Sequence, residues 1–391
     1  SFWLIGKLTT GRFEVLHSAQ FFFFSLFAWL CIADLINLLR IGTLTELRHV
    51  GGRIVFLIFI ITTLAVVRKR TQYKRVLQLL MVSVIILSLF TIACGFLNIN
   101  PLGAHTSRDP RIFWGITMPT KRAIGVPMSY GEYGIIINSV LPLFLMSILH
   151  KDFLAPRMWA LLGTLVLFLA LLVTQSRNSW LATFLAMTFF ATFMITRLRQ
   201  HALKGAICQF GVSTAIIIAI FYYSFFNFIY EGFALGRQAH SFMQRLDSNE
   251  IAKKVFFDNW LLGAGHAEIS EQISSQLDVD LVVHNGYLDQ LASTGLFGFI
   301  PFILLILLSF FVLISVARCG TVFWRPYALC LSASLVANMS ALYAYKGFFC
   351  ETFAIEYGLI LSLIELNQKD KRAFLNIRNS GKRNAQDENI A

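Results

Sequence analysis

The sequence is poor in charged residues and in cysteines, and both shortages limit what the protein can be. Only 14% of its 391 residues are charged, whereas 57% are hydrophobic, which excludes a water-soluble globular domain. The six cysteines include no Cys-x-x-Cys spacing, and no His-Glu-x-x-His sequence occurs. We therefore expect neither a disulfide framework nor a bound metal or other cofactor. An integral membrane protein is the class that this composition favours.

Long apolar runs make up most of the sequence. A bilayer core of about 30 Å takes roughly 20 mostly apolar residues per helix, and about ten such segments can be placed. They lie near residues 18–39, 51–67, 76–98, 128–149, 157–174, 178–196, 207–229, 293–317, 323–344 and 347–366. The runs lack the alternation of a membrane β-barrel, and lipid offers exposed backbone no hydrogen-bond partner. We predict an all-α, polytopic transmembrane bundle that forms one integral-membrane domain over residues 1–391.

Lysines and arginines gather in alternate loops between the predicted spans. Because positive residues are retained on the cytoplasmic side of a membrane, the strongly basic loop 68–75 should be cytoplasmic. Alternation then places further basic segments on the same side, namely 150–157, 197–206, 318–325 and the polar tail 367–391. The chain begins at Ser1 rather than at a methionine, so we expect N-terminal residues before it. An even number of missing spans would preserve this topology.

Three arginines disagree with this orientation. Arg40, Arg48 and Arg53 lie between the first two predicted spans, in a loop that alternation places on the outer face. The net charge of +12 is otherwise explained by the cytoplasmic loops and by contacts with lipid headgroups. The sequence has no basic domain interleaved with aromatic residues. Membrane lipids, and not nucleic acid, are therefore the expected partners.

Two of the predicted outer loops are long, at residues 99–127 and 230–283. Long loops without structure are uncommon in compact proteins, and those that occur are usually functional. In the second loop, apolar residues recur at helical spacing with charged residues between them. They are Phe242, Leu246, Ile251, Val255 and Phe256. We predict an amphipathic helix in this loop, lying on the outer membrane surface.

Three residues on the outer side are candidates for chemistry. Arg177 lies in a tight turn between two apolar spans, Arg245 on the predicted amphipathic helix, and His284 at the start of a span. Each has an ordinary structural explanation, respectively an interface anchor, a solvated helix face and a helix-end histidine. Together, two arginines and a histidine on one side of a membrane match what transfer from a lipid pyrophosphate requires.

The chemistry assigns a role to each of these side chains. Guanidinium groups stay charged and bind phosphate oxygens in a bidentate manner, so Arg177 and Arg245 would hold the leaving group. A neutral imidazole takes a proton from an attacking hydroxyl near neutral pH, so His284 would act on the acceptor. Asn285 would either hydrogen-bond a sugar or cap a helix. Gly295 and Gly298, three residues apart on a helix, would permit close helix packing.

The segment from His284 resembles a motif of the lipopolysaccharide O-antigen ligases and the related O-antigen polymerases. The motif is His, then Asn, Ser or Gln, nine residues, Gly, two residues, and Gly, Thr or Tyr. Its places are filled by His284, Asn285, Gly295 and Gly298. Upstream, residues 259–268 are similar to a family segment that ends in Gly-x-Gly, here Gly263 and Gly265. The usual Asn-Pro start of that segment is Asn259-Trp260 in this chain.

Three other arginines of the predicted outer side also resemble arginines of the family, namely Arg122, Arg177 and Arg245. Arg177 takes the place of the arginine in a Thr-x-(Ser/Thr)-Arg turn, and Arg245 that of an essential arginine in the outer loop. Arg122 resembles the arginine of an Arg-x-x-Gly segment and is a possible substrate-binding residue. The chain departs from the family pattern after Arg122, because Tyr130-Gly131 stands where a Pro-Asn-like turn is usual.

This resemblance implies an inverting, metal-independent glycosyltransferase with a GT-C-like fold of about twelve spans, in the bacterial inner membrane. Its active site would face the periplasm, with both long outer loops on that side. The donor would be O-antigen linked to undecaprenyl pyrophosphate, and the acceptor a sugar hydroxyl of lipid A-core. The expected function is therefore O-antigen ligation in lipopolysaccharide biosynthesis.

Three other functions remain open from the sequence. An O-antigen polymerase would use the same donor with a second lipid-linked glycan as acceptor. A protein O-oligosaccharyltransferase often carries an extra C-terminal periplasmic region, whereas the chain after residue 366 is a short polar tail. A transporter of lipid-linked sugars would favour ionisable residues near the bilayer midplane and paired broken helices. The acidic candidates within spans are Asp34, Glu351 and Glu356.

Overall fold

The structure of the chain is a computed structural model. It describes residues 18–97, 111–113, 116–118, 130–151, 153–174, 176–195, 237–277, 283, 285–343 and 351–388. The helices are α2 (Ser18–Ile41), α3 (Leu44–Val66), α4 (Arg70–Leu97), α5 (Tyr130–Leu149), α6 (Arg157–Thr174), α7 (Arg177–Ile195), α9 (Arg237–Asp258), α10 (His266–Leu277), α11 (Gly286–Cys319), α12 (Arg325–Leu342) and α13 (Glu351–Glu388). A short antiparallel hairpin joins β1 (Arg111–Phe113) to β2 (Ile116–Met118).

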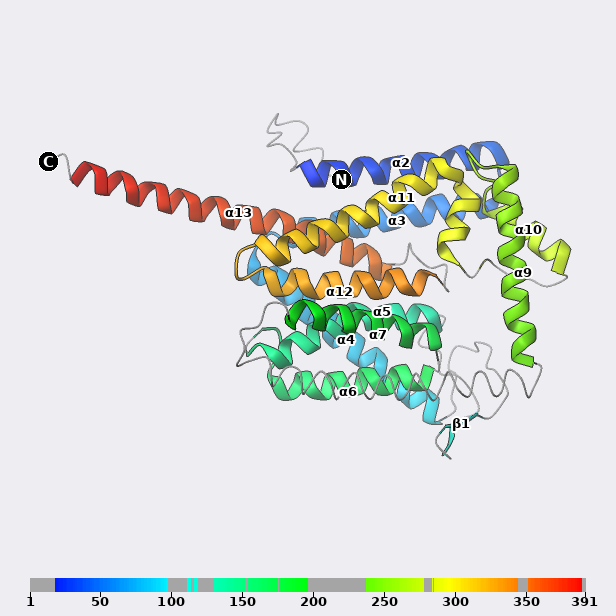
Figure 1. Cartoon of the computed structure of the whole chain (residues 1–391), viewed down its shortest axis with the longest axis horizontal. Helices are drawn as coiled ribbons and strands as arrows, with labels where there is room; N and C mark the ends of the chain where they lie inside the picture. Colours follow the sequence, from blue (N-terminus) through cyan, green and yellow to red (C-terminus); the bar gives the residue numbers. More distant parts are fainter. Residues whose placement is uncertain are drawn as a thin grey trace.

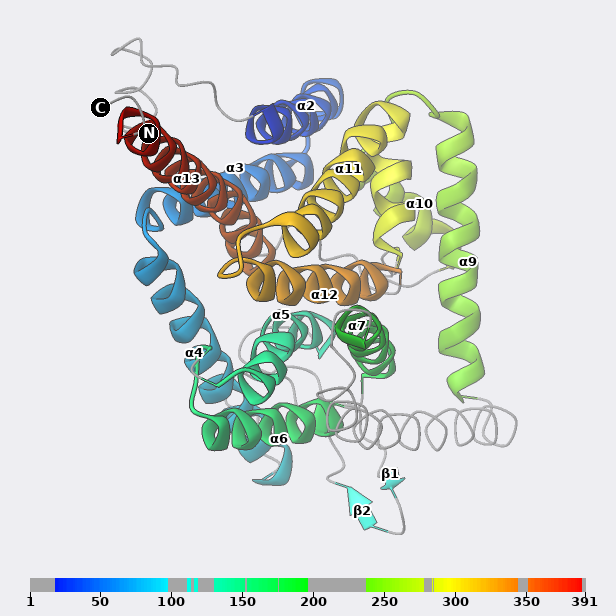
Figure 2. The same cartoon turned by 60° about the vertical axis from the view of Figure 1, so that its left-hand side comes forward.

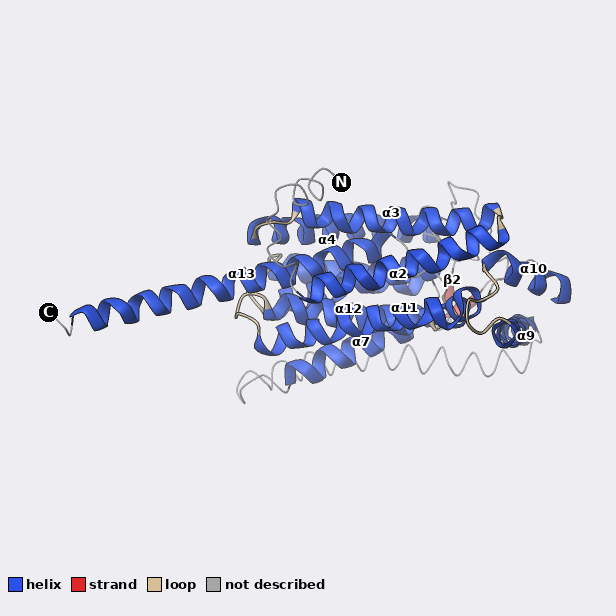
Figure 3. Ribbon diagram, turned by 90° about the horizontal axis from the view of Figure 1, so that it is seen from above, coloured by secondary structure: helices blue, strands red, loops and turns tan. Residues whose placement is uncertain are grey.

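The long helices lie side by side as a bundle, and α9 and α10 lie beyond one end of it (Figure 1). The axis of α9 runs across the bundle, so this helix is seen end-on in Figure 3. We call this end of the bundle, which also carries the α2–α3 connection, the α9 end. At the opposite end, α13 continues well past its neighbours.

The predicted all-α membrane fold is confirmed. Five helices in the described part of the chain are long and apolar enough to cross a membrane, namely α2, α3, α4, α6 and α11. Helices α5 and α7 add the shorter apolar stretches Tyr133–Leu149 and Asn178–Met194. Every predicted span except 207–229 overlaps an observed helix, and 207–229 lies outside the described residues. Large apolar side chains such as Leu79, Ile86 and Leu165 are exposed on the helices, as lipid-facing residues would be.

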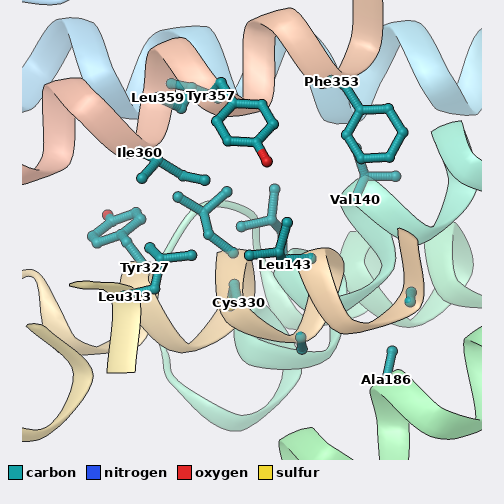
Figure 4. Packing of buried hydrophobic residues seen from close by; sticks show 14 of the residues in the cluster. Val140, Leu143, Ala186, Leu313, Tyr327, Cys330, Phe353, Tyr357, Leu359 and Ile360 are labelled. Carbon is teal, nitrogen blue, oxygen red and sulfur yellow. The ribbon is translucent and has the colours of Figure 1, made fainter. Parts of the chain in front are cut away.

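Helix α12 forms the centre of the bundle. It packs against α5, α7 and α11, and Figure 2 shows it between these helices. Most of its residues are buried, and many are Ala or Ser, which let neighbouring backbones approach closely. Figure 4 shows the adjoining core, which contains Tyr327 and Cys330 of α12, Val140 of α5 and Tyr357 of α13.

Basic residues mark the end of the bundle opposite α9. The α3–α4, α5–α6 and α11–α12 connections lie at the end opposite α9. Basic residues in or beside these connections include Arg68, Lys69, Lys151, Arg157 and Arg325. The helices thus bring three of the basic loops of the sequence together at one end, whereas the basic loop 197–206 lies outside the described residues.

Several boundaries differ from the sequence-based expectations. Helix α3 begins at Leu44 and not near residue 51, so Arg48 and Arg53 lie within this helix, and Arg40 lies within α2. The expected loop that contained all three arginines is therefore wrong. The hairpin β1–β2 lies within the first long loop, where no strand was expected. The polar tail after residue 366 continues as part of α13 to Glu388.

Candidate functional site

Helix α11 is interrupted at Gly295, close to its N-terminus. Gly295 has φ 60° and ψ −167°, a backbone conformation that is essentially restricted to glycine. The residue separates a short first segment, Gly286–Thr294, from a long second segment, Leu296–Cys319. The expectation that Gly295 lies within a regular helix is therefore wrong, whereas the close packing expected at Gly295 and Gly298 is observed.

The interruption leaves backbone groups of α11 free to pair with the loop between α9 and α10. Ala264 N–H and Gly265 N–H donate to the carbonyls of Ala292 and Ser293, each at 2.9 Å. In the other direction, the amides of residues 296 and 297 donate to the carbonyls of residues 260 and 261, also at 2.9 Å. These bonds satisfy groups that a broken helix would otherwise leave unpaired. We call residues 259–265 the docked loop.

Two glycines permit this contact because the backbones approach each other closely. A Cβ atom on Gly263 would lie 2.3 Å from the Ser293 carbonyl oxygen. A Cβ atom on Gly295 would lie 2.4 Å from the Leu261 carbonyl oxygen. Each distance is far shorter than a carbon–oxygen contact allows. The Gly-x-Gly segment and the glycine end of the His284 motif, separate in the sequence, therefore form one packed unit, in which Gly265 and Gly298 are also buried.

Helices α2 and α3 brace this unit from the side. The Asn37 side-chain amide donates to the Ser293 carbonyl at 2.8 Å, and the Arg40 guanidinium donates to the Gly263 carbonyl. A carboxylate oxygen of Glu46, itself buried, accepts the backbone N–H of Ala267 at 2.9 Å. These contacts explain why Arg40 stands at the end of a span, because it donates a hydrogen bond to a carbonyl of the docked loop.

A buried ion pair between α2 and α3 lies beside these hydrogen bonds. The Arg53 guanidinium and the Asp34 carboxylate are 2.5 Å apart, and their side chains are only 3% and 1% exposed. Arg53 also donates to the side-chain oxygen of Gln290 on α11 at 2.9 Å. Sequence reasoning missed this cluster, although Asp34 within a span and Arg53 on the wrong side of the predicted membrane were both visible signals.

Asn285, the second residue of the His284 motif, is the N-cap of α11. Its side-chain oxygen accepts the backbone N–H groups of Tyr287 at 3.0 Å and of Leu288 at 3.2 Å. The helix-capping alternative for Asn285 is therefore the one observed. His284 directly precedes this cap in the sequence and lies outside the described residues.

Arg245 lies on α9, which packs against α10 and α11. Ile251 and Val255 of α9 are buried, whereas Leu246 is exposed, so the predicted amphipathic helix is present with a partly different apolar face. The Arg245 side chain is half-buried, and its carbonyl accepts the Ser248 hydroxyl at 3.0 Å. Within the described part of the chain, no Asp or Glu side chain pairs with the Arg245 guanidinium.

The remaining predicted site residues are placed only in part. Arg177 is the first residue of α7, and its side chain lies outside the described part of the molecule. Arg122 also lies outside the described residues. The start of α11, the helix that carries Arg245 and the turn before α7 are all found at the α9 end (Figure 1). This end therefore brings together elements that are far apart in the sequence.

Comparison with protein families found a match to the family described as O-antigen ligase, over residues 162–303. The matched residues run from α6 to the second segment of α11. They include every predicted site residue except Arg122. A comparison with curated proteins found no match.

The family assigns a general activity to this part of the chain. Its members are membrane-bound, glycosyltransferase-like enzymes of O-antigen processing that act on lipid-linked polysaccharides. The matched range also contains the docked loop, the first segment of α11 and the start of the second segment. Residues 162–303 therefore match the O-antigen ligase family, and the resemblance seen in the sequence is confirmed over this part of the chain.

Proposed function

We propose that the protein is an O-antigen ligase that transfers O-antigen from undecaprenyl pyrophosphate to a sugar hydroxyl of lipid A-core. The observation that carries the proposal is the family match over the residues that form the packed unit at the α9 end. The docked loop and the first segment of α11 belong to this unit, and the chain reaches His284 one residue before Asn285. The hydrogen bonds of this unit thus hold the helix segment that Asn285 caps.

The reaction is a single displacement with inversion at the donor sugar. The acceptor hydroxyl oxygen forms a bond to the anomeric carbon, while the bond from that carbon to the pyrophosphate oxygen breaks. His284 takes the hydroxyl proton, and undecaprenyl pyrophosphate leaves with the bonding electrons. Arg177 and Arg245 bind the pyrophosphate and offset the charge that grows on it. These side chains supply the transfer chemistry without a metal ion, in a GT-C-like fold.

The proposed orientation places the α9 end in the periplasm and the protein in the bacterial inner membrane. It is supported by the basic connections at the opposite end, because positive loops are retained in the cytoplasm. The chain would then form one membrane domain over residues 1–391, with the loops 99–127 and 230–283 in the periplasm and the tail 367–391 in the cytoplasm. The transporter alternative is less well supported, because Asp34 is buried in an ion pair with Arg53.

The ligase proposal is tested by the product that the purified protein forms. We expect protein in lipid nanodiscs, given undecaprenyl-pyrophosphate-linked glycan and lipid A-core, to transfer the glycan to lipid A-core in the presence of a chelator. The products are resolved by gel electrophoresis and mass spectrometry. Lengthening of the lipid-linked glycan without any lipid A-core product would instead identify a polymerase, and loss of transfer with chelator would contradict the metal-independent mechanism.

Removing the Arg245 guanidinium should weaken donor binding. A hydrogen bond to a charged group contributes about 1.5–3 kcal/mol, so Arg245→Ala should raise the donor KM by about 10- to 100-fold. Arg245→Lys should restore only part of the affinity, because an ammonium group cannot bind two phosphate oxygens as a fork does. Initial rates over a range of donor concentrations measure the effect.

The matched control for Arg245 is Lys254→Ala, which removes an exposed positive charge from the same helix. We expect this variant to keep the donor KM of the wild type. An equal effect of both substitutions would show that α9 acts through its overall charge and that Arg245 does not bind the pyrophosphate specifically.

A further inference from the structure

The ion pair between Asp34 and Arg53 is the most deeply buried pair of charges in the described part of the molecule. Both residues lie in helices that are long and apolar enough to span a membrane. Charged side chains in such helices are costly and usually serve a function. A hydrophobic pair of the same volume would pack at least as well as a buried ion pair. Packing alone therefore does not account for Arg53.

Arg53 differs from a simple ion-pair partner because it also contacts another helix. Its Nη2 group donates to the Gln290 side-chain oxygen at 2.9 Å, while its Nε group donates to Asp34. Asp34 therefore holds the planar guanidinium in a fixed orientation from α2. The same guanidinium presents a second donor from α3 to the first segment of α11.

The first segment of α11 depends on such contacts for its orientation. It comprises only residues 286–294, which is too short for a helix to be stable alone, and Gly295 ends its continuity with the rest of α11. On the α2–α3 side, Gln290 and the Ser293 carbonyl receive the bonds from Arg53 and Asn37. On the α12 side, the Tyr287 hydroxyl donates to the Met339 carbonyl at 2.9 Å.

Gln290 is suited to transmit the orientation of Arg53 because both ends of its amide are engaged. Its oxygen accepts from Arg53, and its nitrogen donates to the Thr294 hydroxyl at 2.8 Å. Gln290 is itself only 5% exposed, so water does not readily replace either partner. A shift of Arg53 would therefore have to move the first segment of α11 or break a buried hydrogen bond.

We infer that Arg53 is a positioning residue that, held by Asp34, orients the first segment of α11 through Gln290. The segment ends at its N-terminal cap, Asn285, and the residue before the cap in the chain is His284. Arg53 thereby controls the position of the cap residue Asn285, which follows His284 in the chain. The consequence for catalysis rests on the proposed function of His284, whereas the orienting role of Arg53 does not.

The test replaces the partner of Arg53 and leaves the ion pair in place. Gln290→Leu removes the acceptor without leaving Asp34 or Arg53 unpaired, and Gln290→Glu keeps an acceptor oxygen. We expect Gln290→Leu to lower kcat by about 10²-fold, the effect of a small displacement of a reacting group, with an unchanged donor KM. Gln290→Glu should retain most of the wild-type kcat. The matched control Gln272→Leu breaks only a bond to Glu268 within α10 and should leave kcat unchanged.

A second measurement does not depend on activity. We expect hydrogen–deuterium exchange of residues 286–294 to become faster in Gln290→Leu and to stay at the wild-type rate in Gln290→Glu. Wild-type exchange in Gln290→Leu would overturn the inference, whatever its activity. Faster exchange in Gln290→Leu, combined with a wild type that transfers no glycan, would refute the proposed function and leave the orienting role intact.

If Gln290→Leu does not fold, the same exchange measurement is made on Arg53→Lys. Its single ammonium keeps the charge beside Asp34 but loses the fork that reaches Gln290, so exchange of residues 286–294 should again become faster.

Discussion

Replacing His284 with alanine is expected to lower the rate of glycan transfer by about 10²- to 10⁴-fold, the usual contribution of a general base. The variant loses the group that takes the acceptor proton, whereas both arginines proposed to bind the pyrophosphate remain. Donor binding should therefore persist while turnover is lost. The measurement is an initial rate at saturating donor and acceptor, together with donor affinity measured in the absence of acceptor.

The matched control for His284 is His150→Ala, at an exposed position of the α5–α6 connection, on the opposite end of the bundle. This variant should transfer glycan at the wild-type rate. Thermal unfolding of both variants separates loss of chemistry from loss of structure. A well-folded His284→Ala protein with full turnover would show that another group activates the acceptor.

A methyl group added at Gly295 is expected to detach the docked loop from α11. The new Cβ atom would lie 2.4 Å from the Leu261 carbonyl oxygen and 2.5 Å from the Gly263 amide nitrogen. Neither neighbour can move as a flexible side chain would, because both are backbone atoms. The φ of 60° adds strain of about 1–3 kcal/mol for a residue other than glycine. We therefore expect Gly295→Ala to insert into the membrane, to lose at least about tenfold in transfer rate, and to be cleaved by protease within residues 259–265.

Gly51→Ala serves as the control for Gly295→Ala. Gly51 lies in α3, and a Cβ atom there would meet nothing within 4 Å. Because alanine is the better helix former, this variant should be as stable as the wild type or more stable by up to about 1 kcal/mol. Wild-type protease resistance and transfer in Gly295→Ala would contradict the role assigned to the docked loop.

The sequence alone was sufficient to determine the class of the protein and the course of most helices. A helix in a membrane satisfies its backbone within its own segment, so the apolar runs that became α2, α4, α6 and α12 could be located locally. Helix α9 was also identified from a local pattern, because its apolar residues recur at helical spacing with charged residues between them. The His284 motif, also a local pattern, pointed to the family that matches residues 162–303.

The start of α3 could not be predicted because its charged residues resemble those of a loop. Arg53 is neutralised by Asp34 and bonded to Gln290, which is 237 positions away in the sequence. Arg40 similarly donates to the carbonyl of Gly263, 223 positions away. Nothing within a local window of sequence distinguishes an arginine with such distant partners from one exposed to solvent.

The break at Gly295 was also outside the reach of local reasoning. Two glycines three residues apart in an apolar run indicate close packing of a continuous helix, which Gly298 does provide against Ala33. Gly295 departs from the helix because the docked loop supplies partners for the backbone groups on either side of it. The sequence by itself therefore determined most of the spans and the amphipathic α9, and it supplied the candidate residues, since these depend on neighbours in the chain. Only the tertiary structure decided how the start of α11 is bent and held, since that depends on hydrogen bonds from α2, α3 and the docked loop.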